Sequence, residues 1–301
     1  MIRREFFTTA LAGVAALSGS ARGQSNAPKF KLKYAPHSNM FRESAGENII
    51  DQIKFASDQG FTAWEENNAM RRPVEEQTRM GETFQKLGIT MGVFVSFGSA
   101  SGDSSDFVTR TGRDYQDELR KAMRAALETA KRVGAKWTTV VPNAVNQKLD
   151  PGYQTANCIE NLKVMAEVCE PAGLVMVLEP LNWYTNHPGL FLRSVPQAYA
   201  ICKAVNSPSC KILNDLYHQQ VDIGNLIPNL DMAWAETAYI QVGDNPGRKE
   251  PTTGEINYRN IFKWLHDKGY DGVVGMEHGN SKPGKEGEMA VIAAYRDVDS
   301  F

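Results

Sequence analysis

The sequence lacks an excess of either charge, and it lacks a long apolar run. Its 301 residues include 33 Lys and Arg against 35 Asp and Glu, a formal net charge of −2. Nucleic-acid-binding domains carry a strong basic patch or stripe, so this balance argues against a nucleic-acid partner. No apolar run reaches the roughly 18 residues that a membrane-spanning helix needs. We therefore expect no membrane span once the N-terminal segment is removed.

Two short motifs are also missing. None of the four cysteines belongs to a Cys-x-x-Cys pair, which argues against a zinc knuckle and a redox dithiol. We expect these cysteines to be buried as small apolar residues. No Gly-x-Gly-x-x-Gly follows the first predicted strand, which weakens the case for an open dinucleotide-binding sheet.

The N-terminus has the three parts of an export signal. Arg3 and Arg4 precede an apolar stretch from Phe6 to Leu17, and small residues follow at 18–21. The paired arginines resemble a twin-arginine signal, with an ordinary basic segment as the alternative. We assign residues 1–27 to this signal and a short linker, with the cleavage site open, and residues 28–301 to one folded domain. The expected location is the periplasm.

The remainder of the chain alternates between short β-rich runs and longer amphipathic stretches, eight times over. The predicted strands are Lys31–Pro36, Ala63–Glu66, Thr90–Val95, Trp137–Pro142, Val175–Pro180, Lys211–Leu216, Tyr239–Val242 and Val273–Glu277. The predicted helices are Glu47–Gln59, Val74–Leu87, Tyr115–Val133, Pro151–Cys169, Val195–Val205, Ile223–Asn229, Asn257–Lys268 and Gly284–Ala294.

This alternation predicts a single-domain α/β fold, a (β/α)8 TIM barrel. Strands that alternate with helices form parallel sheets, and eight units of about 34 residues are normal for a closed barrel. Glycines stand where a predicted helix ends before a strand, as expected for left-handed helix ends. They are Gly60, Gly88, Gly134, Gly173 and Gly269.

Polar side chains stand where the predicted strands end, and active sites of such barrels lie at the carboxyl ends of the strands. Four of the five histidines lie at strand ends or in the loop after the fifth strand, and only His266 lies on a predicted helix. A rim this rich in histidine and carboxylate is costly unless it binds something. The residues concerned are His37, Glu65, Glu179, His187, Asp215, His218, Gln241, Glu277 and His278.

Four oxygen donors end four successive strands, and these strands lie about 5 Å apart in a barrel. They are Glu179, Asp215, Gln241 and Glu277. Three carboxylates in one small space repel one another and take up protons, and a divalent cation removes that penalty. Oxygen donors favour one hard cation, Mg²⁺ or Mn²⁺, over zinc. The alternative is a hydrogen-bonded polar rim without metal.

Several of these residues lie in segments that resemble the hydroxypyruvate isomerases, within the xylose-isomerase-like barrels. The segments are Val177–Asn182, Leu213–His218, Tyr239–Pro251, Gly254–Tyr258 and Gly269–Glu277. The resemblance covers most of the mature chain and is densest from about residue 174 to 277. The related ketose 3-epimerases usually have histidine where Gln241 stands.

The resemblance implies roles for individual residues. Those matching Glu179, Asp215, Gln241 and Glu277 bind the metal, and Glu179 and Glu277 also carry the proton. Those matching His218 and Arg248 bind substrate oxygens, and the planar fork of Arg248 suits a carboxylate or a hydroxyl pair. A surface salt bridge with Glu250 or Glu255 is the alternative for Arg248.

Three further residues are weaker candidates for substrate contact. His187 lies in the loop after the fifth strand, where shaping the loop is an equal alternative. His37 and Glu65 lie across the predicted mouth of the barrel.

The expected activity is therefore aldose–ketose isomerisation of a small sugar or hydroxy-keto acid through an enediolate. His278-Gly279-Asn280 after Glu277 departs from the aromatic residue and Lys-Pro pair expected there, and export departs from an intracellular substrate.

Four alternatives stay open. They are a ketose 3-epimerase, a lyase acting on keto-glycosides, an apurinic endonuclease with several zinc ions, and a non-catalytic exported sugar-binding protein. The near-neutral charge and the five histidines disfavour the nuclease. The exact substrate, the metal and the assembly state, monomer or homo-oligomer, also stay open.

Overall fold

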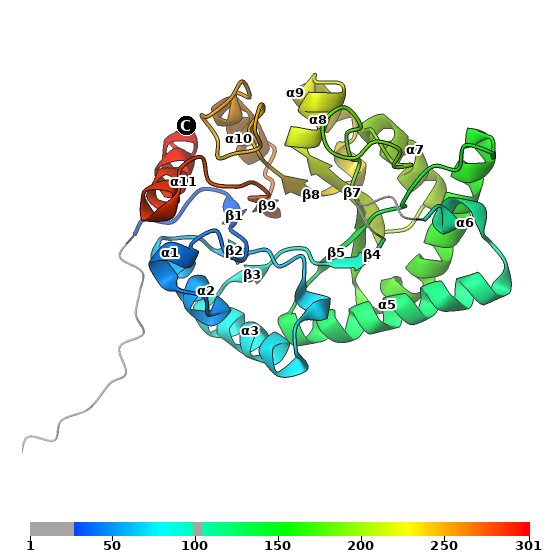
Figure 1. Cartoon of the computed structure of the whole chain (residues 1–301), viewed down its shortest axis with the longest axis horizontal. Coiled ribbons are helices and arrows are strands. Elements are labelled where there is room, and N and C mark those ends of the chain that lie inside the picture. Colours follow the sequence, from blue (N-terminus) through cyan, green and yellow to red (C-terminus); the bar gives the residue numbers. More distant parts are fainter. Residues whose placement is uncertain (1–26, 99–103) are drawn as a thin grey trace, which may run out of the picture.

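The computed structural model describes residues 27–98 and 104–301, and in these ranges the strands alternate with helices (Figure 1). The predicted signal at residues 1–27 lies almost wholly outside them. Every strand pairing of the described residues is parallel. The strands are β1 (Lys33–Ala35), β2 (Ala63–Trp64), β3 (Thr90–Met91), β4 (Val95–Phe97), β5 (Trp137–Val140), β6 (Val175–Leu178), β7 (Cys210–Asp215), β8 (Thr237–Gln241) and β9 (Val273–Gly275).

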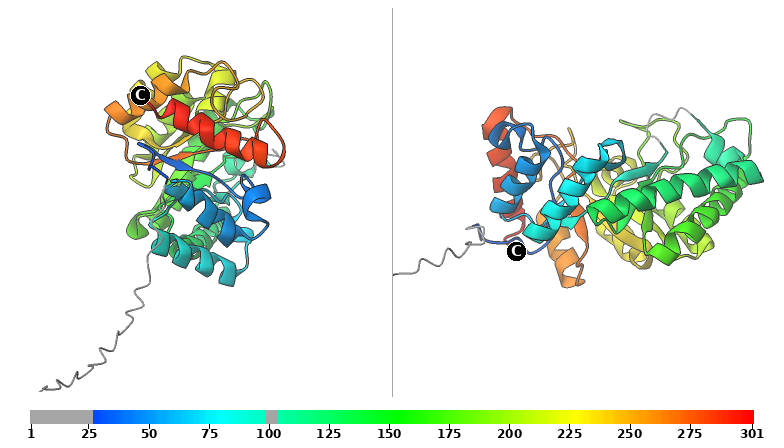
Figure 2. Two further views of the ribbon diagram at one scale, coloured as in Figure 1. Left: turned by 90° about the vertical axis from the view of Figure 1, so that its left-hand side faces the viewer. Right: turned by 90° about the horizontal axis from the view of Figure 1, so that it is seen from below.

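The strands close into a barrel. One sheet has the order β1-β9-β8-β7-β6-β5-β4, and β2 pairs with β3. The remaining gap is closed by a parallel bridge between His37 and Glu65, with the Glu65 amide donating to the Pro36 carbonyl at 2.9 Å. The first and last elements therefore lie side by side, as Figures 1 and 2 show for β1, β9 and α11. The predicted eight-unit barrel is confirmed.

The third predicted strand is split into β3 and β4. Between them the Val93 amide faces the Tyr239 hydroxyl at 3.4 Å. A Cβ at Gly92 would lie 2.2 Å from the same hydroxyl, so only glycine accommodates this approach. The Tyr239 side chain thus takes up a position that would otherwise continue the ladder.

The helices surround the strands, with the long α5 and the adjacent α3 and α6 on the outside (Figures 1 and 2). The predicted bounds of α3, α6 and α7 are confirmed, and the five predicted glycine ends all have positive φ. The described helices are α1 (Arg42–Ala45), α2 (Ile49–Asp58), α3 (Val74–Leu87), α4 (Asp106–Thr109), α5 (Arg113–Val133), α6 (Pro151–Cys169), α7 (Val195–Val205), α8 (Leu216–Asp222), α9 (Leu226–Met232), α10 (Tyr258–Asp267) and α11 (Gly284–Val298), with single 3-10 turns at Ala69–Arg71, Glu170–Ala172 and Trp234–Glu236.

One predicted helix is confirmed only in part. Helix α9 covers Leu226–Asn229 of the predicted Ile223–Asn229, but a second short helix, α8, precedes it, with Gly224 at φ of 61° between the two. Helix α8 begins directly after β7 because the Asp215 carboxylate accepts from the Tyr217 amide at 2.8 Å and caps it. His218 therefore lies on a helix, and the expectation that only His266 does so was wrong.

The barrel interior and the helix–sheet layer are both apolar. Small and branched side chains and one tyrosine fill the centre of the barrel, contributed by β1, β2, the β3–β4 link and β6–β9. They are Ala35, Ala63, Val93, Val177, Leu213, Tyr239 and Val273.

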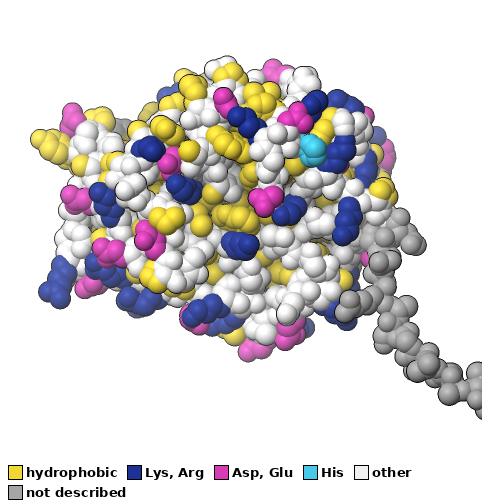
Figure 3. Space-filling view, turned by 180° about the vertical axis from the view of Figure 1, so that it is seen from behind, with side chains coloured by type: hydrophobic (Ala, Val, Ile, Leu, Met, Phe, Trp, Pro, Cys, Tyr) yellow, Lys and Arg dark blue, Asp and Glu magenta, His cyan; other side chains and the backbone are white. Residues whose placement is uncertain are grey.

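All four cysteines are buried and unpaired, as predicted: Cys158, Cys169, Cys202 and Cys210. Within the described ranges no helix is both long and apolar enough to cross a membrane. On the face shown in Figure 3, basic and acidic side chains are interspersed, which matches the small net charge.

Candidate active site

The four predicted donors meet at the carboxyl ends of β6 to β9. Glu179 follows β6 directly, while Asp215 and Gln241 are the last residues of β7 and β8. Asp215 is opposite Gln241 in the ladder and Gln241 is opposite Gly275, so all lie at one level of the barrel. Glu277 comes two residues after β9. The structure thus brings the predicted set together.

Arg248 lies among these carboxylates. Its Nη2 donates to Asp215 Oδ2 at 2.7 Å and to Glu277 Oε2 at 2.6 Å. Its guanidinium stands over the Tyr217 ring, 4.9 Å from the centroid. The alternative of a surface pair with Glu250 or Glu255 does not hold. Paired carboxylates raise the pKa of Arg248 against the opposing effect of burial.

The loop that carries Arg248 is tightly held by Asp244. The Asp244 carboxylate accepts from the amides of Gly254 at 2.8 Å and Ile256 at 3.1 Å, and its carbonyl accepts from the Arg248 amide at 2.8 Å. Arg248 has φ of 51°, and a Cβ at Gly243 would lie only 3.0 Å from its Cγ. This fold of the loop directs Arg248 inward.

The two predicted proton-transfer carboxyls have raised pKa values. Burial raises the pKa of Glu179 well above its usual range, and repulsion from Glu277 and Asp215 adds to this effect. Burial is also the main cause that raises the pKa of Glu277, with Arg248 opposing it. A carboxyl of this kind holds a proton closer to neutral pH than an exposed one does.

The side chain of Gln241 is hydrogen-bonded to Glu65. Its Nε2 donates to Glu65 Oε1 at 2.8 Å, which leaves the buried Gln241 Oε1 with no hydrogen-bond partner among the described residues. Glu65 occupies the barrel interior, where a Cβ at Gly275 would lie 2.3 Å from Glu65 Oε1. The pKa of Glu65 is raised by burial and by repulsion from Glu277. Its predicted contact with substrate stays a prediction.

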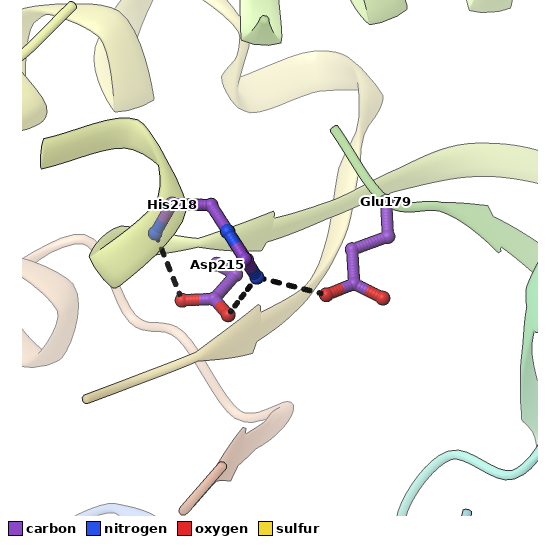
Figure 4. A group of neighbouring side chains, drawn as sticks. All are labelled: Glu179, Asp215 and His218. Carbon is purple, nitrogen blue, oxygen red and sulfur yellow. Dashed lines mark hydrogen bonds and ion pairs between the residues drawn. The ribbon is translucent and has the colours of Figure 1, made fainter. Parts of the chain in front are cut away.

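His218 is fully buried and faces two of the carboxylates. Its Nε2 lies 3.5 Å from Asp215 Oδ2 and 3.9 Å from Glu179 Oε1 (Figure 4). Burial lowers the pKa of His218 to about 3, so the ring is neutral at ordinary pH. The ring of His187 lies beside it, with the centroids 5.3 Å apart.

His37 lies across the mouth from these residues. Its Nε2 is 3.1 Å from the His278 carbonyl, and its charge acts to lower the pKa of Glu277. His278 in turn is buried against the Tyr295 hydroxyl at 2.9 Å. His37 therefore borders the carboxylate group, and its contact with substrate stays a prediction.

Sequence reasoning missed several neighbours of the site. Asn67 donates to Glu277 Oε1 at 3.2 Å and also lines a cavity of about 400 Å³. Asn182 and Asn186 lie behind His218 and Tyr217. Asn182 follows directly on the Glu-Pro-Leu segment that comes after β6, so its place in that motif was the available signal.

The donor set fits a divalent cation. Glu179, Asp215 and His218 each offer one atom, and these atoms lie within 4.8 Å of one another. The unpartnered Gln241 Oε1 and the mutually repelling carboxylates are further oxygen donors that a cation would satisfy. Glu179, Asp215, Gln241 and Glu277 would hold it, with His218 as a competing nitrogen donor.

Comparison with known proteins places the chain among related barrels. Residues 53–297 match the family described as xylose isomerase-like TIM barrel. The chain is 33% identical over 168 residues to hydroxypyruvate isomerase from Escherichia coli, over 54% of this chain and 63% of that protein. It is 28% identical over 243 residues to 2-oxo-tetronate isomerase from Cupriavidus necator, over 80% and 90%.

Some of these alignments are partial. In several of them this chain spans 61 to 63% of the relative's length, which is less than two thirds. Among solved structures, an AP endonuclease, family 2 from Brucella melitensis superposes with a TM-score of 0.74 at 25% identity, over 88% of this chain and 99% of that one.

Proposed function

Since the chain belongs to the xylose isomerase-like TIM barrel family, we propose that it is a divalent-metal-dependent isomerase of a small hydroxy-keto acid or sugar. The observation that carries the proposal is the convergence of Glu179 and Glu277 with Arg248 at the strand ends. Two carboxyl groups of raised pKa beside the guanidinium of Arg248 suit proton transfer next to a carbonyl. The relatives named hydroxypyruvate isomerase and 2-oxo-tetronate isomerase support this reaction class.

The two glutamates divide the proton transfer between them. One carboxylate removes the proton from the hydroxyl-bearing carbon beside the carbonyl, which gives an enediolate. A carboxyl returns a proton to the former carbonyl carbon, and the hydroxyl proton moves to the former carbonyl oxygen. Arg248 orients a substrate carboxylate or hydroxyl pair, since its guanidinium offers further N–H donors beyond Nη2. When bound, a divalent cation held by the four donors would polarise the carbonyl and stabilise the negative charge that develops.

Binding by the four oxygen donors alone suits Mg²⁺ or Mn²⁺. Zinc competes with these ions for the site only if His218 is also a ligand. The relatives' names point to a short substrate such as hydroxypyruvate or 2-oxo-tetronate. Ketose 3-epimerisation uses the same residues, so product analysis distinguishes it from isomerisation and from cleavage.

The test is deuterium incorporation. The purified protein, loaded with Mn²⁺ in D₂O, is given a panel of keto-acids and sugars, and we expect deuterium at the carbon next to the carbonyl. Glu277→Gln lowers the exchange by about a hundredfold or more, the usual contribution of a general base. Glu286→Gln, which removes an exposed carboxylate on α11, serves as the matched control. Unchanged exchange in Glu277→Gln would sink the mechanism.

A wider proposal concerns the location of the protein. Export by the twin-arginine pathway is supported by Arg3-Arg4 before the apolar stretch, and fractionation of cells making Arg3→Lys/Arg4→Lys protein tests it. A nuclease activity, as named for the Brucella relative, is disfavoured by the net charge of −2.

A further inference from the structure

Nδ1 of the His218 ring is contacted by Asn182. The Asn182 side-chain Nδ2 lies 2.7 Å from His218 Nδ1, and the Asn182 backbone amide donates to the same nitrogen at 3.4 Å. Both residues are fully buried. Two groups that carry hydrogen thus point at one ring nitrogen.

The orientation of the Asn182 amide is determined by its other contacts. Its Oδ1 accepts from the backbone amides of Thr185 at 3.0 Å and Asn186 at 3.3 Å. Its Nδ2 also donates to Asn186 Oδ1 at 3.0 Å, and that oxygen accepts from the Tyr217 hydroxyl at 3.0 Å. If Oδ1 and Nδ2 exchanged places, the Asn182 NH₂ group would face the backbone N–H groups of Thr185 and Asn186. Donors would then meet donors, so the network excludes the flipped amide.

Among the described residues His218 Nδ1 faces only donors, so this nitrogen has to accept. A neutral imidazole carries one proton, on either Nδ1 or Nε2, and which nitrogen carries it is set by the hydrogen bond that the other makes. We propose that Asn182 is a positioning residue that keeps the proton of His218 on Nε2, so that His218 donates to a substrate oxygen and does not bind the cation.

The front of the ring agrees with this assignment. His218 Nε2 points toward Asp215 Oδ2 and Glu179 Oε1, and a lone pair there would face two carboxylates (Figure 4). An N–H is attracted by the same carboxylates. Nε2 has no hydrogen-bond partner among the described residues, so its proton remains to be donated to a substrate oxygen.

The assignment decides between two ligand sets. Glu179, Asp215 and His218 would form a mixed nitrogen and oxygen site, which suits zinc. With Nε2 protonated, His218 cannot bind the cation. The ligands are then Glu179, Asp215, Gln241 and Glu277, which all offer oxygen and suit Mg²⁺ or Mn²⁺. The inference rests on the proposed function for the identity of the substrate, but the position of the proton does not depend on turnover.

The test is Asn182→Asp. The variant has the same shape and keeps the acceptor that binds the Thr185 and Asn186 amides, but its second oxygen replaces Nδ2 and now needs a proton on His218 Nδ1. Nε2 then presents a lone pair to the site. Asn186→Asp is the matched control, because it adds the same charge on the neighbouring side chain that Asn182 Nδ2 contacts and retains an acceptor for the Tyr217 hydroxyl.

The first readout is ¹⁵N NMR of the His218 ring, assigned by loss of its signals in His218→Asn. We expect a protonated Nε2 and an unprotonated Nδ1 in the wild type and in Asn186→Asp, and the reverse in Asn182→Asp. The second is calorimetric titration with Zn²⁺ and with Mg²⁺. The added charge raises both affinities, but the ratio of zinc to magnesium affinity rises by about tenfold only in Asn182→Asp.

The third readout is kinetic. If the protein turns over a keto-acid, Asn182→Asp weakens binding of the oxygen that His218 contacts and raises KM by about tenfold. A wild-type spectrum with the proton on Nδ1, or an unchanged tautomer in a folded Asn182→Asp, would overturn the inference. If that variant does not fold, the wild-type spectrum alone decides. Absence of any isomerase activity beside the expected spectra would refute the proposed function and leave this inference standing.

Discussion

At the scale of single residues, one guanidinium pairs with two of the carboxylates at the mouth of the barrel. Arg248 Nη2 contacts both Asp215 and Glu277, while Glu179 receives no direct ion pair from it in the structure. Removing one member of such a buried group leaves the others uncompensated, which is costly. Loss of a single contact in this group should therefore change stability as well as catalysis.

Arg248→Ala lowers the free energy of unfolding by about 3 kcal/mol in the absence of added metal, since Asp215, which is fully buried, and Glu277 both lose their half-buried partner. Saturating Mn²⁺ reduces this deficit because the cation neutralises the same carboxylates. Urea unfolding with and without Mn²⁺ measures the difference. Arg259→Ala, which breaks an exposed pair with Asp297, is the control and changes little in either condition. An equal loss with and without Mn²⁺ would contradict the assignment of these carboxylates to the cation.

Gly275→Ala destabilises the protein by about 2 kcal/mol, the usual cost of overfilling a packed interior. The new Cβ would lie 2.3 Å from Glu65 Oε1, so Glu65 has to move and release Gln241. Thermal or urea unfolding measures the loss. Gly112→Ala is the control, because nothing lies within 4 Å of the added atom. Equal stability of the two variants would show that Glu65 moves freely.

At the scale of elements, the helical and strand periodicity of apolar residues was sufficient to locate most helices and strands of the barrel. The helices at Val74–Leu87, Pro151–Cys169 and Val195–Val205 have their predicted bounds, because apolar spacing and caps are local properties. The miss after β7 has a local cause as well. Asp215 was assigned to the strand end as a ligand, but the same carboxylate also caps α8 and starts a helix where a loop was expected.

The N-terminus of α6 provides a test at this scale. The Asp150 carboxylate accepts from the Gly152 amide at 2.8 Å, and Pro151 occupies the first helical position. Asp150→Ala removes this cap and lowers the free energy of unfolding by about 1 kcal/mol. Asp150→Asn retains an acceptor and stays within a few tenths of the wild type, about 0.3 kcal/mol. Chemical denaturation compares the two, and equal losses would argue against a capping role.

At the scale of the whole molecule, the site joins the first half of the barrel to the second. Glu65, directly after β2, supports Gln241 from β8, and Asn67 supports Glu277 after β9. A cation at this place would therefore connect several strands that are far apart in the sequence. Ligands that bind only the folded state stabilise it by mass action.

Metal removal should consequently be visible in the global unfolding transition. After exhaustive chelation, adding Mn²⁺ at about a hundred times its Kd stabilises the protein by about 2.7 kcal/mol. Calorimetry measures the accompanying rise in Tm. Asp215→Asn abolishes most of this rise, whereas Glu286→Gln on α11 preserves it. A wild-type Tm that is indifferent to every divalent cation would contradict a metal site.

The sequence by itself determined the order of strands and helices, the closing of the barrel and the strand ends at which polar residues stand. These follow from apolar period, glycine positions and chain length, all of which act over short distances along the chain. Tertiary structure alone decided how the polar residues pair. Gln241 meets Glu65 across 176 residues, and Arg248 reaches Asp215 across 33. Such pairs depend on ladder register and loop shape, so no local pattern contains them, and the same is true of the Asn182 contact that orients His218.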